Sequence, residues 1–157
     1  MKSKKTILWF AVLLLAAVTA YSQNNQENHS LNMEGWTRWG GVRVSAQGNT
    51  VTLNGTVVTA GYLNESLNPN MRGRMIILEI QNAQACVFSE ARMLKITYNE
   101  EETVIWPENV AQLIRNEYVP SSYRRIEFIL PEDFAGRLNF VFYQATLNDF
   151  RITAWYR

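Results

Sequence analysis

Apolar and polar residues alternate in short runs from Gly35 to the end of the chain, and Gly, Asn and Pro separate the runs. Alternation with a period of two is typical of β-strands, in which successive side chains point to opposite faces. The pattern predicts strands at 41–46, 50–53, 56–59, 74–80, 92–98, 103–106, 123–130, 137–145 and 148–156. Asn54-Gly55 predicts a tight hairpin turn between the second and third of them. Eight or nine such strands fit two packed sheets, so we expect an all-β sandwich.

One segment departs from the alternation. Pro107 begins a stretch to Glu117 in which Val110, Leu113 and Ile114 fall on one side of a helix. Proline is well suited to a first helical turn. We therefore expect at most one short helix, at 107–117.

Within the longer predicted strands, one parity of positions is almost wholly apolar, and we expect it to form the core. These residues are Leu94, Ile96, Tyr98, Ile126, Phe128, Leu130, Leu138, Phe140, Phe142, Phe150, Ile152 and Ala154. The other parity mixes aromatic, amide, charged and aliphatic side chains, whereas a purely solvated face carries mostly charge. It includes Met75, Ile77 and Met93. We expect this parity to make one outward surface that can meet a partner.

The N-terminus has the order of a secretory signal: basic Lys2, Lys4 and Lys5, an apolar run at 7–18, and small residues after it. We predict a signal peptide at 1–22, cleaved after Ser22 or, alternatively, after Ala20. An uncleaved anchor is the alternative, although the run is short for a membrane span. The polar stretch 23–34 predicts a linker, and 35–157 the β-sandwich domain. We therefore expect the mature protein to be secreted, in the periplasm or outside the cell, and not to insert stably into a membrane after cleavage.

Charge and cysteine content exclude further classes of protein and of partner. The lone Cys86 lies far from the cleavage site and cannot close an intramolecular disulfide, so we expect no lipid anchor and a domain held by its core alone. Without the three signal lysines, 12 basic side chains face 14 acidic ones, a net charge of −2. Nucleic acid is therefore not expected as a partner, because phosphate binding needs clustered positive charge.

Catalytic patterns are sparse. The sole histidine, His29, falls in the predicted linker, so a nucleophile would have no histidine base, and clustered zinc ligands are absent. Cys86 is expected to be a small buried residue. Glu79 and Glu127 share strand parity, so a two-carboxylate glycoside hydrolase is the remaining enzyme alternative. We expect no enzyme, cofactor or metal; a structural calcium ion would have to rely on Glu, Asn and backbone carbonyls.

The mixed parity supplies most candidate ligand-binding residues. Sugars stack their C–H faces on aromatic rings and pair their hydroxyls with carboxylates, amides and guanidinium groups. The candidates are Glu79, Lys95, Arg125, Glu127, Asn139, Tyr143 and Trp155, together with the loop aromatics Trp39 and Tyr62. The alternative is that the charged members form cross-strand ion pairs on a solvated sheet. Trp36 is expected to plug the sandwich end.

The ending Gly136-Arg-Leu-Asn-Phe-Val-Phe-Tyr-Gln-Ala-Thr-Leu-Asn-Asp149-Phe-Arg-Ile-Thr-Ala resembles the last two strands of jelly-roll carbohydrate-binding modules of the galactose-binding-like superfamily. The opening, with Trp36 and the run at 74–80, is also similar, so the resemblance spans most of 35–156. It implies a two-sheet jelly roll that binds a glycan on a sheet face or at loop tips. The family's modules usually accompany a glycosidase, whereas we expect this chain to act without a catalytic domain beside it. The alternative is an envelope protein that uses the sandwich to bind another protein.

Overall fold

A computed structural model describes residues 27–34, 37–39, 41–64, 69–100 and 102–157, with the backbone alone for 37–39, 58–64 and 69. The predicted signal peptide at 1–22 and Trp36 lie outside these residues. In the described part, no helix is long and apolar enough to cross a membrane.

The chain has an all-β fold, as its alternation predicts. The strands are β1 (His29–Ser30), β2 (Thr37–Trp39), β3 (Arg43–Gln47), β4 (Thr50–Asn64), β5 (Met75–Gln81), β6 (Val87–Phe88), β7 (Arg92–Tyr98), β8 (Thr103–Val104), β9 (Val119–Pro120), β10 (Arg125–Ile129) and β11 (Leu138–Tyr156). The helices of the described residues are short 3₁₀ turns, η1 (Pro69–Met71), η2 (Ala83–Ala85) and η3 (Ser89–Ala91).

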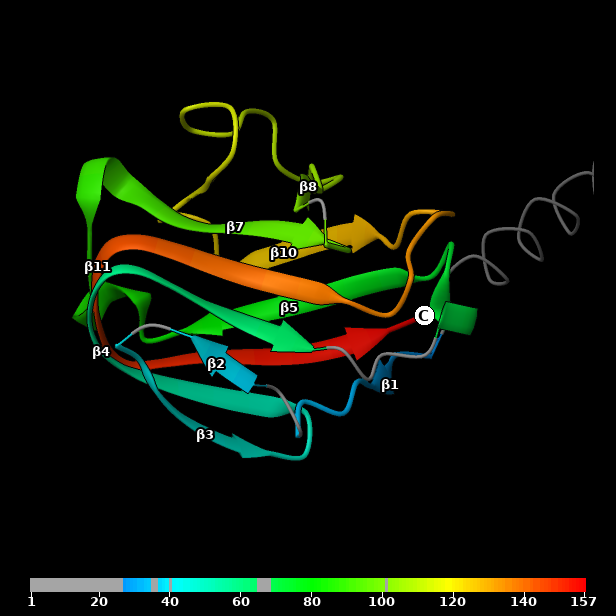
Figure 1. The fold of residues 1–157 in the computed structure, drawn as a ribbon, viewed down its shortest axis with the longest axis horizontal. Coiled ribbons are helices and arrows are strands. Elements are labelled where there is room, and N and C mark those ends of the chain that lie inside the picture. The colour runs from blue at the N-terminus through cyan, green and yellow to red at the C-terminus, as the bar shows by residue number, and fades with distance from the viewer. Residues whose placement is uncertain (1–26, 35–36, 40, 65–68, 101) are drawn as a thin grey trace, which may run out of the picture.

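Two long strands, β4 and β11, give the fold its sandwich-like shape. They pair antiparallel along most of their lengths and turn together at one end of the molecule (Figure 1). The start of β4 and the end of β11 form a first layer with β3, β5 and β10. The end of β4 and the start of β11 form a second layer with β2, β7 and β8. β9 pairs with the other end of β7.

The predicted hairpin at Asn54-Gly55 is wrong, because these residues lie within β4. Gly55 has a φ of 142°, and the chain there passes from the first layer to the second. The hairpin turn instead lies between β3 and β4, where Gly48 has a φ of 57°. The two predicted closing strands are likewise one strand, β11, with a register shift between Leu147 and Phe150. Turn-forming residues thus mark a change of layer as well as a reversal of direction.

The predicted helix at 107–117 is also wrong. Backbone Glu108 N donates to Glu127 O at 2.7 Å, and the Asn109 side chain donates to Arg125 O and accepts from Glu127 N, both at 2.8 Å. These bonds hold the segment along the free edge of β10. Tertiary hydrogen bonds therefore replace the local bonds of a helix.

The predicted linker boundary at residue 34 needs correction, because the folded part begins earlier. β1 pairs with the end of β11, and Leu31 N donates to Ala154 O at 3.0 Å. Leu31 and Met33 are buried in the core. These two apolar side chains, just after β1 and two positions apart, show that the segment packs on the core, a signal that its polar composition obscures.

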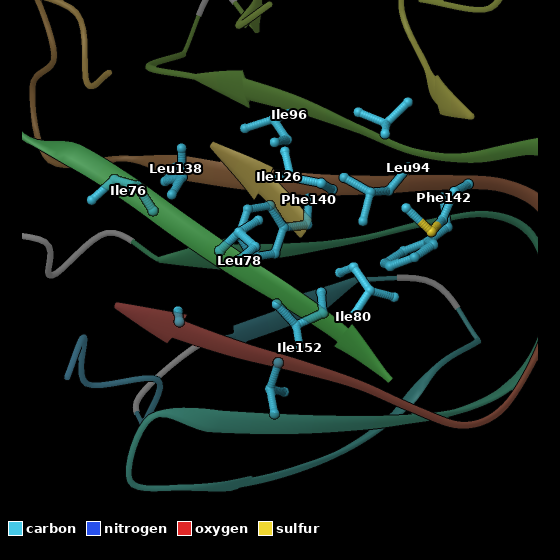
Figure 2. Close-up of a cluster of buried hydrophobic side chains, with 14 of the residues drawn as sticks. Ile76, Leu78, Ile80, Leu94, Ile96, Ile126, Leu138, Phe140, Phe142 and Ile152 are labelled. Carbon is cyan, nitrogen blue, oxygen red and sulfur yellow. The ribbon is translucent and has the colours of Figure 1, made fainter. Parts of the chain in front are cut away.

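The predicted core residues are all buried in the hydrophobic core. Figure 2 shows some of them, among them Leu94, Ile126 and Phe140, between the two layers. Ile76, Leu78 and Ile80 of β5 join them. Met93 is in the core as well, contrary to its predicted outward position. A bulge explains the difference: Arg92 pairs with Pro120 and Leu94 with Val119, so two residues of β7 oppose one of β9. A bulge of this kind reverses the face to which a side chain points.

Candidate functional site

The residues that were expected to point outward lie on two opposite outer faces of the sandwich, one on each layer. Glu79, Arg125, Glu127 and Trp155 lie in paired positions of the first layer. Lys95, Asn139 and Tyr143 lie on β7 and β11 in the second layer. The expectation of one continuous surface is therefore wrong. Parity separates the core face from the outer face in most places, although Ile77, which was expected on the outward surface, is fully buried. It does not assign a strand to a layer.

On the first layer, Arg125 pairs with both predicted carboxylates. Its Nη1 lies 3.4 Å from Glu79 Oε1, and its Nε lies 2.5 Å from Glu127 Oε1. All three side chains are partly exposed. The pair of Arg125 with Glu79 is the cross-strand ion pairing that the sequence left open as an alternative, whereas Glu127 lies on the same strand as Arg125. The two carboxylates thus share one cation.

Three other candidate ligand-binding residues lie at positions that differ from those expected. Asn139 is only 4 % exposed and donates to Thr97 Oγ1 at 3.0 Å, so it joins β11 to β7 and does not reach a ligand at the surface. Tyr62 was expected in a loop but belongs to β4, where its backbone pairs with that of the buried Phe140. Trp39 belongs to β2 and pairs with Gly61. The side chains of Tyr62 and Trp39 lie outside the described residues.

The outer face of the second layer carries a pocket of about 390 Å³ around Tyr143, which we call the arginine–tyrosine pocket. It is lined by Glu90, Arg92, Arg115, Glu117, Tyr118 and Tyr143. These residues come from η3, β7, β11 and the turn that precedes β9. The bulge in β7 turns Arg92 outward into the pocket, and the bridge between Ile114 and Tyr118 closes the turn.

Two tyrosine rings flank the Arg92 guanidinium. Its Cζ lies 4.5 Å from the centre of the Tyr143 ring and 5.5 Å from that of Tyr118. Lys95 Nζ lies 5.8 Å from the Tyr118 ring. Burial raises the pKa of Tyr118 above its ordinary value; nearby Lys95 and Arg92 oppose this, whereas Glu117 and Tyr143 add to it. Tyr118 therefore keeps its proton, and its ring meets the two cations as a neutral π face.

Ion pairs frame the same pocket. Arg115 donates from Nη2 and Nε to Glu90 Oε2, at 2.9 and 3.0 Å. Lys95 Nζ lies 3.2 Å from Glu117 Oε2. Arg92 Nε is farther from Glu90 Oε2, at 3.7 Å. Rings, carboxylates and cations thus meet in one hollow, where the charged groups can form hydrogen bonds with hydroxyls and the rings can contact apolar faces.

The backbone around the pocket is unusual. Five non-glycine residues there have positive φ: Glu90 (52°), Ala91 (57°), Arg115 (54°), Asn116 (61°) and Gln144 (46°). Each such conformation costs about 1 kcal/mol or more for most side chains, and it gathers where function constrains the chain. The αL conformations of Glu90 and Arg115 accompany the ion pair that these two residues make across the pocket.

A second hollow of about 670 Å³ lies where β7 ends and β11 begins, and we call it the end hollow. Its lining includes Tyr98, Asn99, Glu100, Asp133 and Arg137. Tyr98 Oη donates to Asp133 Oδ1 at 3.0 Å, and buried Arg137 Nε has no hydrogen-bond acceptor among the described residues. Carboxylates outnumber cations among these lining residues.

Of the candidates predicted from the sequence, Tyr143 lines the arginine–tyrosine pocket and Lys95 borders it. Sequence reasoning did not identify Glu90, Arg92, Arg115 or Glu117 as ligand-binding residues. Nothing local distinguishes these residues from surface charges, because the pocket forms only when the turn before β9 folds onto β7. In the described part of the chain, no cluster of three or more His, Cys, Asp or Glu side chains could hold a metal ion.

Comparisons with known proteins leave the family open. No protein-family model matches the chain, and no curated protein does. Among solved structures, a chain of the glycosylation associate protein complex from Streptococcus agalactiae aligns with a TM-score of 0.35 and 10 % identity, over 84 % of this chain and 44 % of that one. This chain thus spans less than half the length of that neighbour.

Proposed function

We propose that this protein is a secreted, non-catalytic carbohydrate-binding protein and that its glycan binds in the arginine–tyrosine pocket. The observation that carries the proposal is the meeting of Tyr143 and Tyr118 with paired carboxylates and cations in one surface hollow. Its volume, about 390 Å³, is within the range of small-ligand pockets, about 300–1,000 Å³. The resemblance to jelly-roll modules of the galactose-binding-like superfamily favours the same class of ligand.

The chemistry of the pocket suits a sugar. Glu90 and Glu117 accept hydrogen bonds from hydroxyls, and the guanidinium groups of Arg92 and Arg115 donate to them. The Arg92 guanidinium covers one face of the Tyr143 ring, which keeps both groups in place. The existing ion pairs hold the polar groups before a ligand arrives, and such preorganisation favours binding.

Protein binding is the second candidate function. Trp106, Ile129 and Val87 are large apolar side chains that the fold leaves exposed. They belong to three different segments: the loop after β8, β10 and β6. A hydrolase has less support, because Glu79 and Glu127 both pair with Arg125.

A glycan array with the purified exported protein tests the proposal. We expect binding to a defined set of glycans, and a loss of about tenfold in affinity, equal to about 1.4 kcal/mol, for Tyr143→Ala. Arg125→Gln is the matched control, because it changes a charged side chain on the opposite face. Trp155→Ala tests the other outer face.

Binding that survives Tyr143→Ala but is lost with Trp155→Ala would move the site to the first layer. An absence of binding on a broad panel would overturn the proposed function and favour a protein partner. Urea denaturation of each variant separates lost binding from lost folding.

A further inference from the structure

We infer that the arginine–tyrosine pocket is built for an acidic saccharide, one that carries an oxyanion such as a carboxylate or a sulfate, and that Arg92 binds this group. The inference rests on the proposed function and names its class of ligand. The fork of a guanidinium group matches the paired oxygens of an oxyanion.

The charges in and around the pocket do not cancel. The lining itself is balanced, with Arg92 and Arg115 against Glu90 and Glu117. Lys95, at the border of the pocket, pairs with Glu117 and adds a third positive charge. Each carboxylate already has a close cation: Arg115 binds Glu90 at 2.9 Å, and Lys95 binds Glu117 at 3.2 Å. The remaining charge is that of Arg92.

Arg92 makes a long ion pair with Glu90, whereas the other two cations make shorter ones. Its side chain is only 13 % exposed, and its Nε has two long contacts, at 3.4 Å to Ser89 O and 3.7 Å to Glu90 Oε2. Among the described residues, its terminal Nη atoms have no hydrogen-bond partner. A cation that has lost most of its hydration gains strongly from an anionic partner. The rings of Tyr143 and Tyr118 both contact its guanidinium group and help to hold it in place.

The end hollow has the opposite balance of charge. Its lining holds two carboxylates, Glu100 and Asp133, and one arginine, Arg137, so its net charge is negative and disfavours an oxyanion. The net charge of the protein does not favour anions either, because the chain without its predicted signal carries 12 basic and 14 acidic side chains. A preference for acidic ligands therefore has to come from the local arrangement around Arg92.

Calorimetry with matched oligosaccharides tests the inference. The probes are an oligogalacturonate, its methyl ester, which is neutral and has the same length, and a sulfated oligosaccharide. We expect the acid to bind at least about tenfold more tightly than the ester, with an advantage that shrinks as salt rises. Tight binding of the sulfated probe alone identifies sulfate as the oxyanion that Arg92 takes.

Two variants of Arg92 test whether this side chain causes the preference for the acid. Arg92→Met keeps a long side chain beside Tyr143 and should remove the preference for the acid, leaving weak binding of the ester. Arg92→Lys keeps the charge but lacks the fork, so part of the preference should remain. Arg43→Met is the matched control, because it removes an exposed arginine from β3 in the first layer.

The outcomes separate the two proposals. Equal affinity for acid and ester, or an equal loss in Arg43→Met, would overturn the inference about Arg92 and leave the proposed glycan binding intact. Failure of all three probes and of neutral glycans on the array would overturn both. An Arg92→Met variant with an unchanged urea midpoint and an unchanged preference for the acid would also overturn the inference.

Discussion

Replacing Gly55 by alanine tests the physical basis of the two-layer fold. β4 passes from one layer to the other at this residue, where φ is 142°. A Cβ placed on Gly55 would lie 2.8 Å from the backbone Gly41 O and 3.4 Å from Val42 Cα. Backbone atoms cannot swing aside as a flexible side chain can, so the crossing has to shift.

Two effects together lower the free energy of unfolding of the Gly55→Ala variant. A backbone conformation that L residues rarely adopt costs about 1–3 kcal/mol. Overpacking against a rigid neighbour costs about 1–3 kcal/mol more, and local relaxation relieves part of it. We expect the free energy of unfolding to fall by about 2–4 kcal/mol, a large share of the roughly 5–15 kcal/mol that holds a typical domain together.

The assay is urea denaturation followed by tryptophan fluorescence, with Gly48→Ala as the control. Gly48 has a φ of 57°, and a Cβ there would meet nothing within 4 Å. Only backbone strain applies, so the expected loss is about 1 kcal/mol. A Gly55→Ala loss below about 0.5 kcal/mol, or one no larger than that of Gly48→Ala, would refute the close-approach argument.

Two further predictions concern the buried Asn139 and Cys86, which was expected to be buried and is only partly so. Asn139→Ala should lower the free energy of unfolding by about 1–3 kcal/mol, because it leaves the buried Thr97 hydroxyl without its partner; in a double-mutant cycle with Thr97→Val, additive losses would contradict this. Burial raises the pKa of Cys86 above its ordinary value of 9.0; nearby Asp149 adds to this, and a hydrogen bond with the Asn148 backbone opposes it. The unfolded thiol therefore ionises first as pH rises, so unfolding free energy should fall above pH 9. Cys86→Ala should weaken this slope, and an unchanged slope would contradict the assignment.

Much of the fold follows from the sequence, because the side of a strand on which a residue lies is a local property. Alternation along 92–98, 123–130, 137–145 and 148–156 correctly predicts extended segments and the core residues on them, although the last two runs form one strand, β11. It fails where a contact distant in sequence intervenes. Pairing with β9 bulges β7, which buries Met93 and turns Arg92 outward. Hydrogen bonds to β10 replace the helix expected at 107–117.

The candidate site shows the same division more sharply. The sequence by itself determined that Tyr143 and Glu127 point away from the core, since strand geometry alternates the side chains of neighbouring residues. Only the tertiary structure decided that they lie on opposite faces, because layer membership depends on pairing between segments far apart in the chain. The same pairing brings Arg92 of β7 and Tyr118 of a distant turn to Tyr143. No local pattern encodes that meeting, since it arises only when β4 and β11 bend and the turn before β9 packs on β7.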